Sequence, residues 1–170
     1  MWTARRILKE LADADRRRAI LTYFWKHADQ QHRLVVQMHL ARAMNFREES
    51  LRKMPPEKKA DLLASRMGAP ELEQFLEMAL MLYHTHEKKA MMGAFLDRWN
   101  VPHDDGSIES DDYTPPNIDA VRGAVRELGD AYDPKDVRIY LATAGLLMDE
   151  SWRDATWPVA DEMETGATGS

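Results

Sequence analysis

The sequence predicts an all-α protein, an irregular single-domain helical bundle of six or seven helices with two long central helices. Three observations lead to this fold class. Apolar residues recur at spacings of three and four along most of the 170 residues, no segment alternates with the period of two that a half-exposed strand requires, and proline or glycine separates the periodic segments. With 44% hydrophobic residues the chain can bury one core, so we expect one domain over residues 1–160 and a disordered tail over residues 161–170.

The first half of the chain predicts a short helix followed by a long one. The apolar face that includes Ile7 and Leu11 points almost opposite to the face that includes Ile20 and Phe24, so one straight helix cannot bury both. We therefore expect a break at residues 13–15, where an aspartate can cap the next helix. The following apolar stripe keeps its phase to about residue 44, which predicts one long helix, or two collinear ones, over residues 15–47.

The second half predicts the other long helix, over residues 70–100. It begins at Pro70, a favourable first-turn residue, and ends before Pro102. Pro55-Pro56 opens a short helix before it. An acidic loop over residues 103–113 follows, then a helix after Pro115-Pro116 and a last one that starts at Asp133-Pro134 with a cap and a first-turn proline.

Composition limits the possible functions. The chain has no cysteine, which excludes disulfides, thiolate metal sites and a cysteine nucleophile. No apolar run is long enough for a membrane span or a signal core, so we expect a cytoplasmic, soluble protein. Residues 1–67 carry a net charge of +7 and residues 68–170 a net charge of −13. The acidic total argues against broad nucleic-acid binding, and the asymmetry favours attraction between the two halves, within one molecule or between two molecules of a homodimer. We expect a protein partner or a second copy of the chain as the binding partner.

Catalytic and metal motifs fail at essential positions. His86-Glu87 begins the zinc-protease pattern H-E-x-x-H, but Ala90 stands where the second histidine is needed. The acidic loop matches several positions of a calcium-binding EF-hand loop, but Val101 occupies the first ligand position. We therefore assign no catalytic residue, no metal ligand and no cofactor, and leave enzymatic activity open.

Polar residues interrupt the apolar stripes of both long helices. His27 and Gln31 lie on the first stripe, His86 lies on the second, and Asp97 stands near the end of the same face. If the two helices pack together, these side chains could form a buried polar pocket that binds a small ligand or a metal. The alternative is that each histidine satisfies a separate hydrogen-bond partner in the core.

The stretch Leu63–Leu72 resembles the helix-turn-helix pattern of small bacterial regulators. This resemblance implies DNA binding through the helix that follows Pro70. That helix carries Glu71, Glu73 and Glu77, which would repel phosphates. Three functions therefore remain: a non-enzymatic helical interaction or scaffold module, possibly homodimeric; a ligand- or metal-binding protein, possibly an enzyme, that uses the His/carboxylate pocket; and a DNA-binding regulator.

Overall fold

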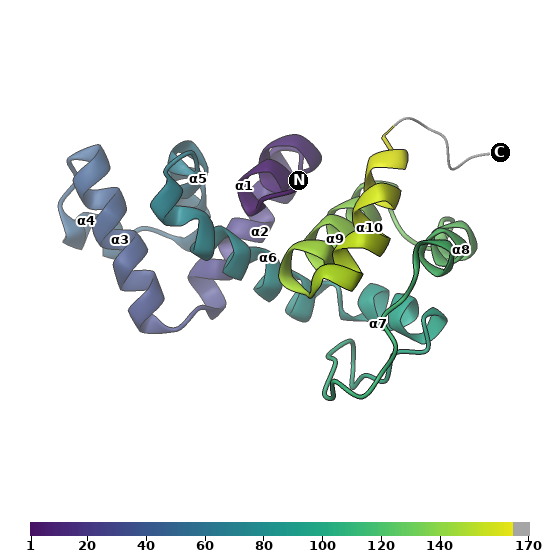
Figure 1. Cartoon of the computed structure of the whole chain (residues 1–170). Coiled ribbons are helices and arrows are strands. Elements are labelled where there is room, and N and C mark those ends of the chain that lie inside the picture. The colour runs from purple at the N-terminus through teal and green to yellow at the C-terminus, as the bar shows by residue number, and fades with distance from the viewer. Residues whose placement is uncertain (165–170) are drawn as a thin grey trace. The chain divides into compact units, whose positions relative to one another are not determined.

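The computed structural model describes residues 1–164, and this part of the chain is all-α (Figure 1). It contains ten α-helices, one π-helical segment and one 3₁₀ segment, with no β-strand among these residues. The chain divides into two compact units. We call residues Thr3–Tyr83 the N-terminal unit, and Met1–Trp2 together with the chain from His84 onward the C-terminal unit. The all-α class is confirmed, and the single domain over residues 1–160 stays a prediction.

In the N-terminal unit the most extensive helix packing is between α2 and α5, which share an apolar core. Its elements in chain order are α1 (Ala4–Arg6), the π-helical η1 (Ile7–Leu11), α2 (Ala14–His27), α3 (Gln30–Met44), α4 (Glu48–Arg52), α5 (Pro56–Arg66), the 3₁₀ segment η2 (Pro70–Leu72) and most of α6 (Glu73–Glu87).

The break predicted at residues 13–15 is present. The Asp13 carboxylate accepts the Arg16 backbone N–H at 2.9 Å and so caps α2. On the other side of the break, the Arg17 guanidinium donates to the carbonyls of Leu8 at 2.7 Å and Ala12 at 3.0 Å. A cationic donor therefore satisfies carbonyls that the end of η1 leaves without helical partners.

Of the two alternatives for residues 15–47, one long helix or two collinear ones, the structure has two helices, α2 and α3. Ala28 and Asp29 have extended backbone angles, and the Asp29 side chain accepts the His32 backbone N–H at 2.9 Å. Asp29 thus acts as the cap of a new helix, α3, instead of a residue inside a longer one.

The C-terminal unit is built around α9, which is buried along most of its length. Its further helices are α7 (Lys89–Arg98), α8 (Ile118–Leu128), α9 (Pro134–Leu147) and α10 (Glu150–Glu162). In Figure 1, α9 and α10 lie side by side. Gly145 permits their close approach, because a Cβ added there would lie 2.4 Å from Trp157 Nε1.

The long helix expected over residues 70–100 is also divided. A 3₁₀ turn precedes α6, and Lys88, with φ −111° and ψ 22°, separates α6 from α7. At the other end of the unit, α10 continues past the expected boundary at residue 160 as far as Glu162. The remainder of the expected tail, residues 165–170, lies outside the described residues.

Candidate functional site

The four side chains predicted to form a ligand pocket lie at the surface. His27, on α2, and Gln31, in the first turn of α3, are both exposed in the N-terminal unit. His86, near the end of α6, and Asp97, on α7, are both exposed in the C-terminal unit. The expected burial of these residues is therefore not observed; His27, Gln31 and His86 stand at helix ends, where the chain turns, and not inside a continuous helix. Ligand binding by them stays a prediction.

Asp97 pairs with a histidine that the sequence did not indicate. Its carboxylate lies 3.0 Å from His103 Nε2, and the other ring nitrogen of His103, Nδ1, accepts the Gly106 backbone N–H at 3.0 Å. Because Nδ1 is an acceptor, Nε2 carries the proton and donates it to Asp97. Both nitrogens are engaged, so this pair orders the chain between α7 and α8 and leaves no nitrogen to act as a general base.

The buried histidine of α6 is His84, not His86. His84 is 3% exposed, and its ring centroid lies 5.7 Å from that of Tyr140 on α9. Burial raises the pKa of the Tyr140 hydroxyl above its usual value. The buried row Leu76, Leu80 and His84 has a spacing of four, which was available in the sequence as an alternative to the row that leads to His86.

The acidic loop has a defined conformation. Asp104 and Ser107 exchange two backbone hydrogen bonds of 2.8 Å around Asp105-Gly106, and both of these central residues have positive φ. Farther along, the Tyr113 hydroxyl accepts the indole N–H of Trp152 on α10 at 3.2 Å. Within residues 1–164 no group of three or more His, Cys, Asp or Glu side chains is arranged to hold a metal ion.

The helix-turn-helix interpretation rests on α5 and α6, and two basic side chains of α5 are engaged within the protein. Lys59 Nζ lies 5.2 Å from the centroid of the Trp25 ring, and Arg66 donates to the Ala43 carbonyl at 3.3 Å. Burial and the charge of Glu73 raise the pKa of Glu77 on α6. DNA binding through these helices stays a prediction.

The largest exposed apolar feature of the N-terminal unit is the outer face of α3. Leu34 is 44% exposed, Val35 is 47% exposed and Met38 is 38% exposed. Two shallow hollows meet at Val35 and Met38. One hollow is completed by His39, Arg42 and Ala43, and the other by Asp29, Gln30, Gln31 and Leu34.

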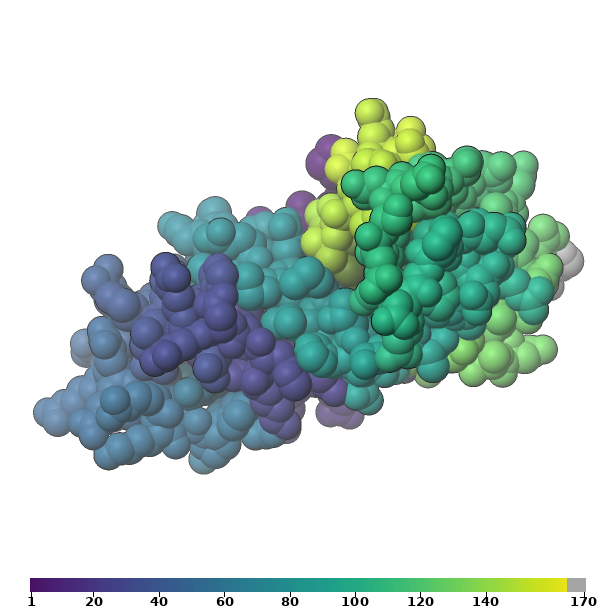
Figure 2. All heavy atoms as spheres, turned by 90° about the horizontal axis from the view of Figure 1, so that it is seen from below, coloured from purple at the N-terminus to yellow at the C-terminus, as the bar shows by residue number. Residues whose placement is uncertain are grey.

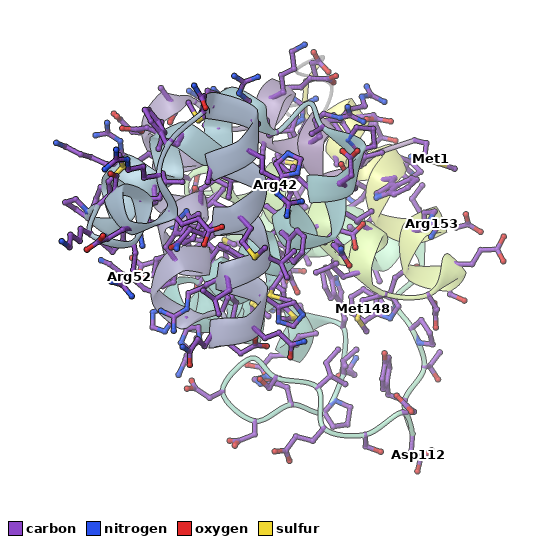
Figure 3. All side chains as sticks on the ribbon, turned by 90° about the vertical axis from the view of Figure 1, so that its left-hand side faces the viewer. Met1, Arg42, Arg52, Asp112, Met148 and Arg153 are labelled. Carbon is purple, nitrogen blue, oxygen red and sulfur yellow. The ribbon has the colours of Figure 1, made fainter. Side chains whose placement is uncertain are left out.

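Figures 2 and 3 show α3 at the surface of the N-terminal unit. Figure 3 looks onto α3, with Arg42 labelled on it, and in Figure 2 the dark blue atoms of α3 form part of the visible surface. The opposite side of the helix packs into the unit, where Val36 and Leu40 are buried. The hydrophobic stripe of α3 is therefore two-sided, which is unusual for a surface helix and typical of an interaction site.

Comparison of the chain with family models, curated proteins and solved structures finds no match. None of the helices in residues 1–164 has the length and apolar character needed to cross a membrane.

Proposed function

We propose that the protein is a helical interaction module, without enzymatic chemistry of its own, that forms a homodimer through the outer face of α3. The observation that carries this proposal is the exposure of three neighbouring apolar side chains of α3, Leu34, Val35 and Met38. Their removal from water favours association, and a second copy of the same face offers matching apolar area.

Charge favours an antiparallel arrangement of the two α3 helices. Asp29 stands at the N-terminus of α3 and Arg42 in its last turn, while the helix itself contains no acidic residue. Antiparallel packing brings Arg42 of one copy toward Asp29 of the other and opposes the two helix dipoles. Parallel packing would instead place Arg42 beside Arg42 of the second copy.

The distribution of exposed residues supports one register. Gln31, Val35, Met38 and Arg42 fall within an arc of about 60° on an ideal helix. A two-fold axis between residues 36 and 37 places Val35 opposite Met38 of the second copy and Gln31 opposite Arg42 of the second copy. In this register the apolar centres of the two faces contact each other and the polar ends also contact each other, as in self-complementary interfaces.

The expected affinity is modest. Full burial of such side chains contributes about 1.5–3 kcal/mol each, and about two-fifths of each is still exposed, so six side chains supply about 4–8 kcal/mol. Association itself costs about 4–15 kcal/mol. At the favourable ends of both ranges the net association free energy is about −4 kcal/mol, so we expect a weak dimer that forms only at high concentration.

Sedimentation velocity up to about 1 mM chain tests the proposal, because an association free energy near −4 kcal/mol is detectable there. Wild type should show reversible dimerisation that Met38→Lys abolishes. Leu147→Lys on α9 is the matched control, since Leu147 and Met38 are each 38% exposed. A monomer at every concentration, or equal loss of dimer in both variants, would refute the proposal.

Cysteine cross-linking tests the orientation, since the natural chain has no cysteine. A mixture of Gln31→Cys and Arg42→Cys proteins should form the mixed disulfide, while each variant alone should not link to itself. In a parallel dimer the two self-links would dominate instead. That result would leave the dimer standing and reject the antiparallel register.

A further inference from the structure

A cluster of nitrogen donors in the N-terminal unit lacks an acceptor. Trp25 of α2 is 4% exposed, and the Arg33 guanidinium of α3 donates through Nη1 to the Trp25 carbonyl at 3.3 Å. The Lys59 ammonium of α5 lies over the Trp25 ring, 5.2 Å from its centroid. Three helices thus bring an indole and two cations together around one buried side chain.

Two of these donors are buried without a hydrogen-bond partner. They are the indole Nε1–H of Trp25 and the Nε–H of Arg33. Buried polar groups in native proteins are nearly always paired, and an exception calls for a water, an ion or a ligand that completes the set. Because Trp25 and Arg33 also contact each other, their two unpaired N–H groups indicate a bound group that accepts hydrogen bonds at this place.

The cluster also lacks negative charge. Among residues 1–164, no carboxylate forms an ion pair with Arg33 or Lys59. Other cations of the same unit are paired: Arg18 binds Asp61 through two bonds of 2.8 and 2.6 Å, and Lys26 lies 3.5 Å from Glu57. Burial, followed by the positive charge of Arg33, lowers the pKa of Lys59. The two cations repel each other in a partly desolvated place.

We infer that Trp25, Arg33 and Lys59 form a binding site for a small oxyanion, a carboxylate or a phosphate group, between α2, α3 and α5. An oxyanion supplies several acceptor lone pairs and the negative charge, whereas a water molecule supplies acceptors alone. Lys59 is only half-buried, so one side of the cluster is open to an anion from solvent. This inference does not depend on dimerisation.

Titration of the full-length protein with inorganic phosphate, and separately with acetate, tests the site at constant ionic strength maintained with sodium chloride. The reporter is the indole ¹H–¹⁵N resonance of Trp25, assigned by its absence in Trp25→Phe. At least one of the two anions should shift this resonance saturably, and which one does so identifies the group that the site accepts.

Variants establish whether the site or general charge is responsible. Lys59→Met should weaken binding at least about tenfold, because a charge-assisted bond is lost. Lys58→Met, the exposed neighbour on α5, should keep the dissociation constant within about twofold of wild type. Arg33→Gln provides a second loss-of-binding variant should Lys59→Met fold poorly.

The same variants provide an independent stability measurement. Lys59→Met should melt above wild type in chloride alone, because removal of one cation relieves the repulsion. The binding anion should then raise the melting temperature of wild type and not that of Lys59→Met. No saturable shift with either anion, an unchanged affinity in Lys59→Met, or an equal loss in Lys58→Met overturns the inference.

Discussion

Replacement of Gly145 by alanine tests the packing of α9 against α10. The added Cβ would lie 2.4 Å from Trp157 Nε1 and 2.6 Å from Thr156 Oγ1, distances that real Cβ contacts do not show. Trp157 Nε1 donates to the Ala142 carbonyl at 3.1 Å, so a ring displaced by the new methyl group also loses this bond. Both helices are therefore affected by one carbon atom.

The magnitude follows from three contributions. Overpacking costs about 1–3 kcal/mol, and the lost hydrogen bond costs about 1 kcal/mol. The greater helix propensity of alanine returns about 1 kcal/mol. We expect Gly145→Ala to lower the free energy of unfolding by about 1–3 kcal/mol, which corresponds to a fall in Tm of several degrees for a chain of this size.

Gly123 on α8 provides the control. A Cβ added there meets nothing within 4 Å, so Gly123→Ala gains helix propensity without a clash and should raise stability by about 0.5–1 kcal/mol. Urea denaturation monitored by far-UV circular dichroism measures both variants. Stabilisation by Gly145→Ala as large as that by Gly123→Ala would refute the assigned close approach of the two helices.

Three further predictions concern charged side chains of the N-terminal unit. Arg17→Met should destabilise the protein by about 1.5–3 kcal/mol in urea denaturation, because carbonyls at the end of η1 lose a charged donor; Arg17→Lys should restore little, since lysine lacks the planar fork. Burial and Glu73 raise the pKa of Glu77, so its ionised form disfavours the folded state. Glu77→Gln should therefore raise Tm at pH 7 and lose this advantage below the ordinary pKa of 4.5; an equal gain at low pH would contradict the assignment. The hydrogen bonds from Arg18 lower the pKa of Asp61 below 3.8, so this pair stabilises the fold above that pH and its effect disappears as pH falls further. Melting curves of Asp61→Asn and wild type should consequently converge in acid, and a gap that persists there would show that the pair acts through packing.

Much of the secondary structure could be read from local chemistry. The cap at Asp13 and the start at Asp133-Pro134 were predicted from side chains that bind first-turn N–H groups, and both are present. The cap at Asp29 was missed because the apolar stripe keeps its phase across it, so periodicity alone gave no sign of a turn. The residue type alone does not tell whether an aspartate caps a helix or lies inside one.

The predicted site was less accessible to such reasoning. The apolar stripe that includes His86 runs past Lys88 in the sequence, whereas in the structure α6 ends before Lys88 and a new helix begins after it. The Asp105-Gly106 turn was visible in the sequence, because Asp-Gly is a strong signal for a two-residue turn with positive φ.

Other features need three-dimensional information. Trp25, Arg33 and Lys59 come from three helices, and no spacing rule relates them. Whether the outer side of α3 is covered likewise depends on the positions of the other elements, because both sides of that helix are apolar in sequence.

Trp2 can reach its native contacts only late in the synthesis of the chain. It is 5% exposed, belongs to the C-terminal unit and stacks beneath the Arg138 guanidinium, which lies 6.0 Å from its ring centroid. On the ribosome the second residue must therefore wait until more than 130 others have been translated before its neighbour exists. A fragment that begins at His84 would leave the Trp2 contact surface bare, so the C-terminal unit is completed by residues that precede the whole N-terminal unit in the sequence.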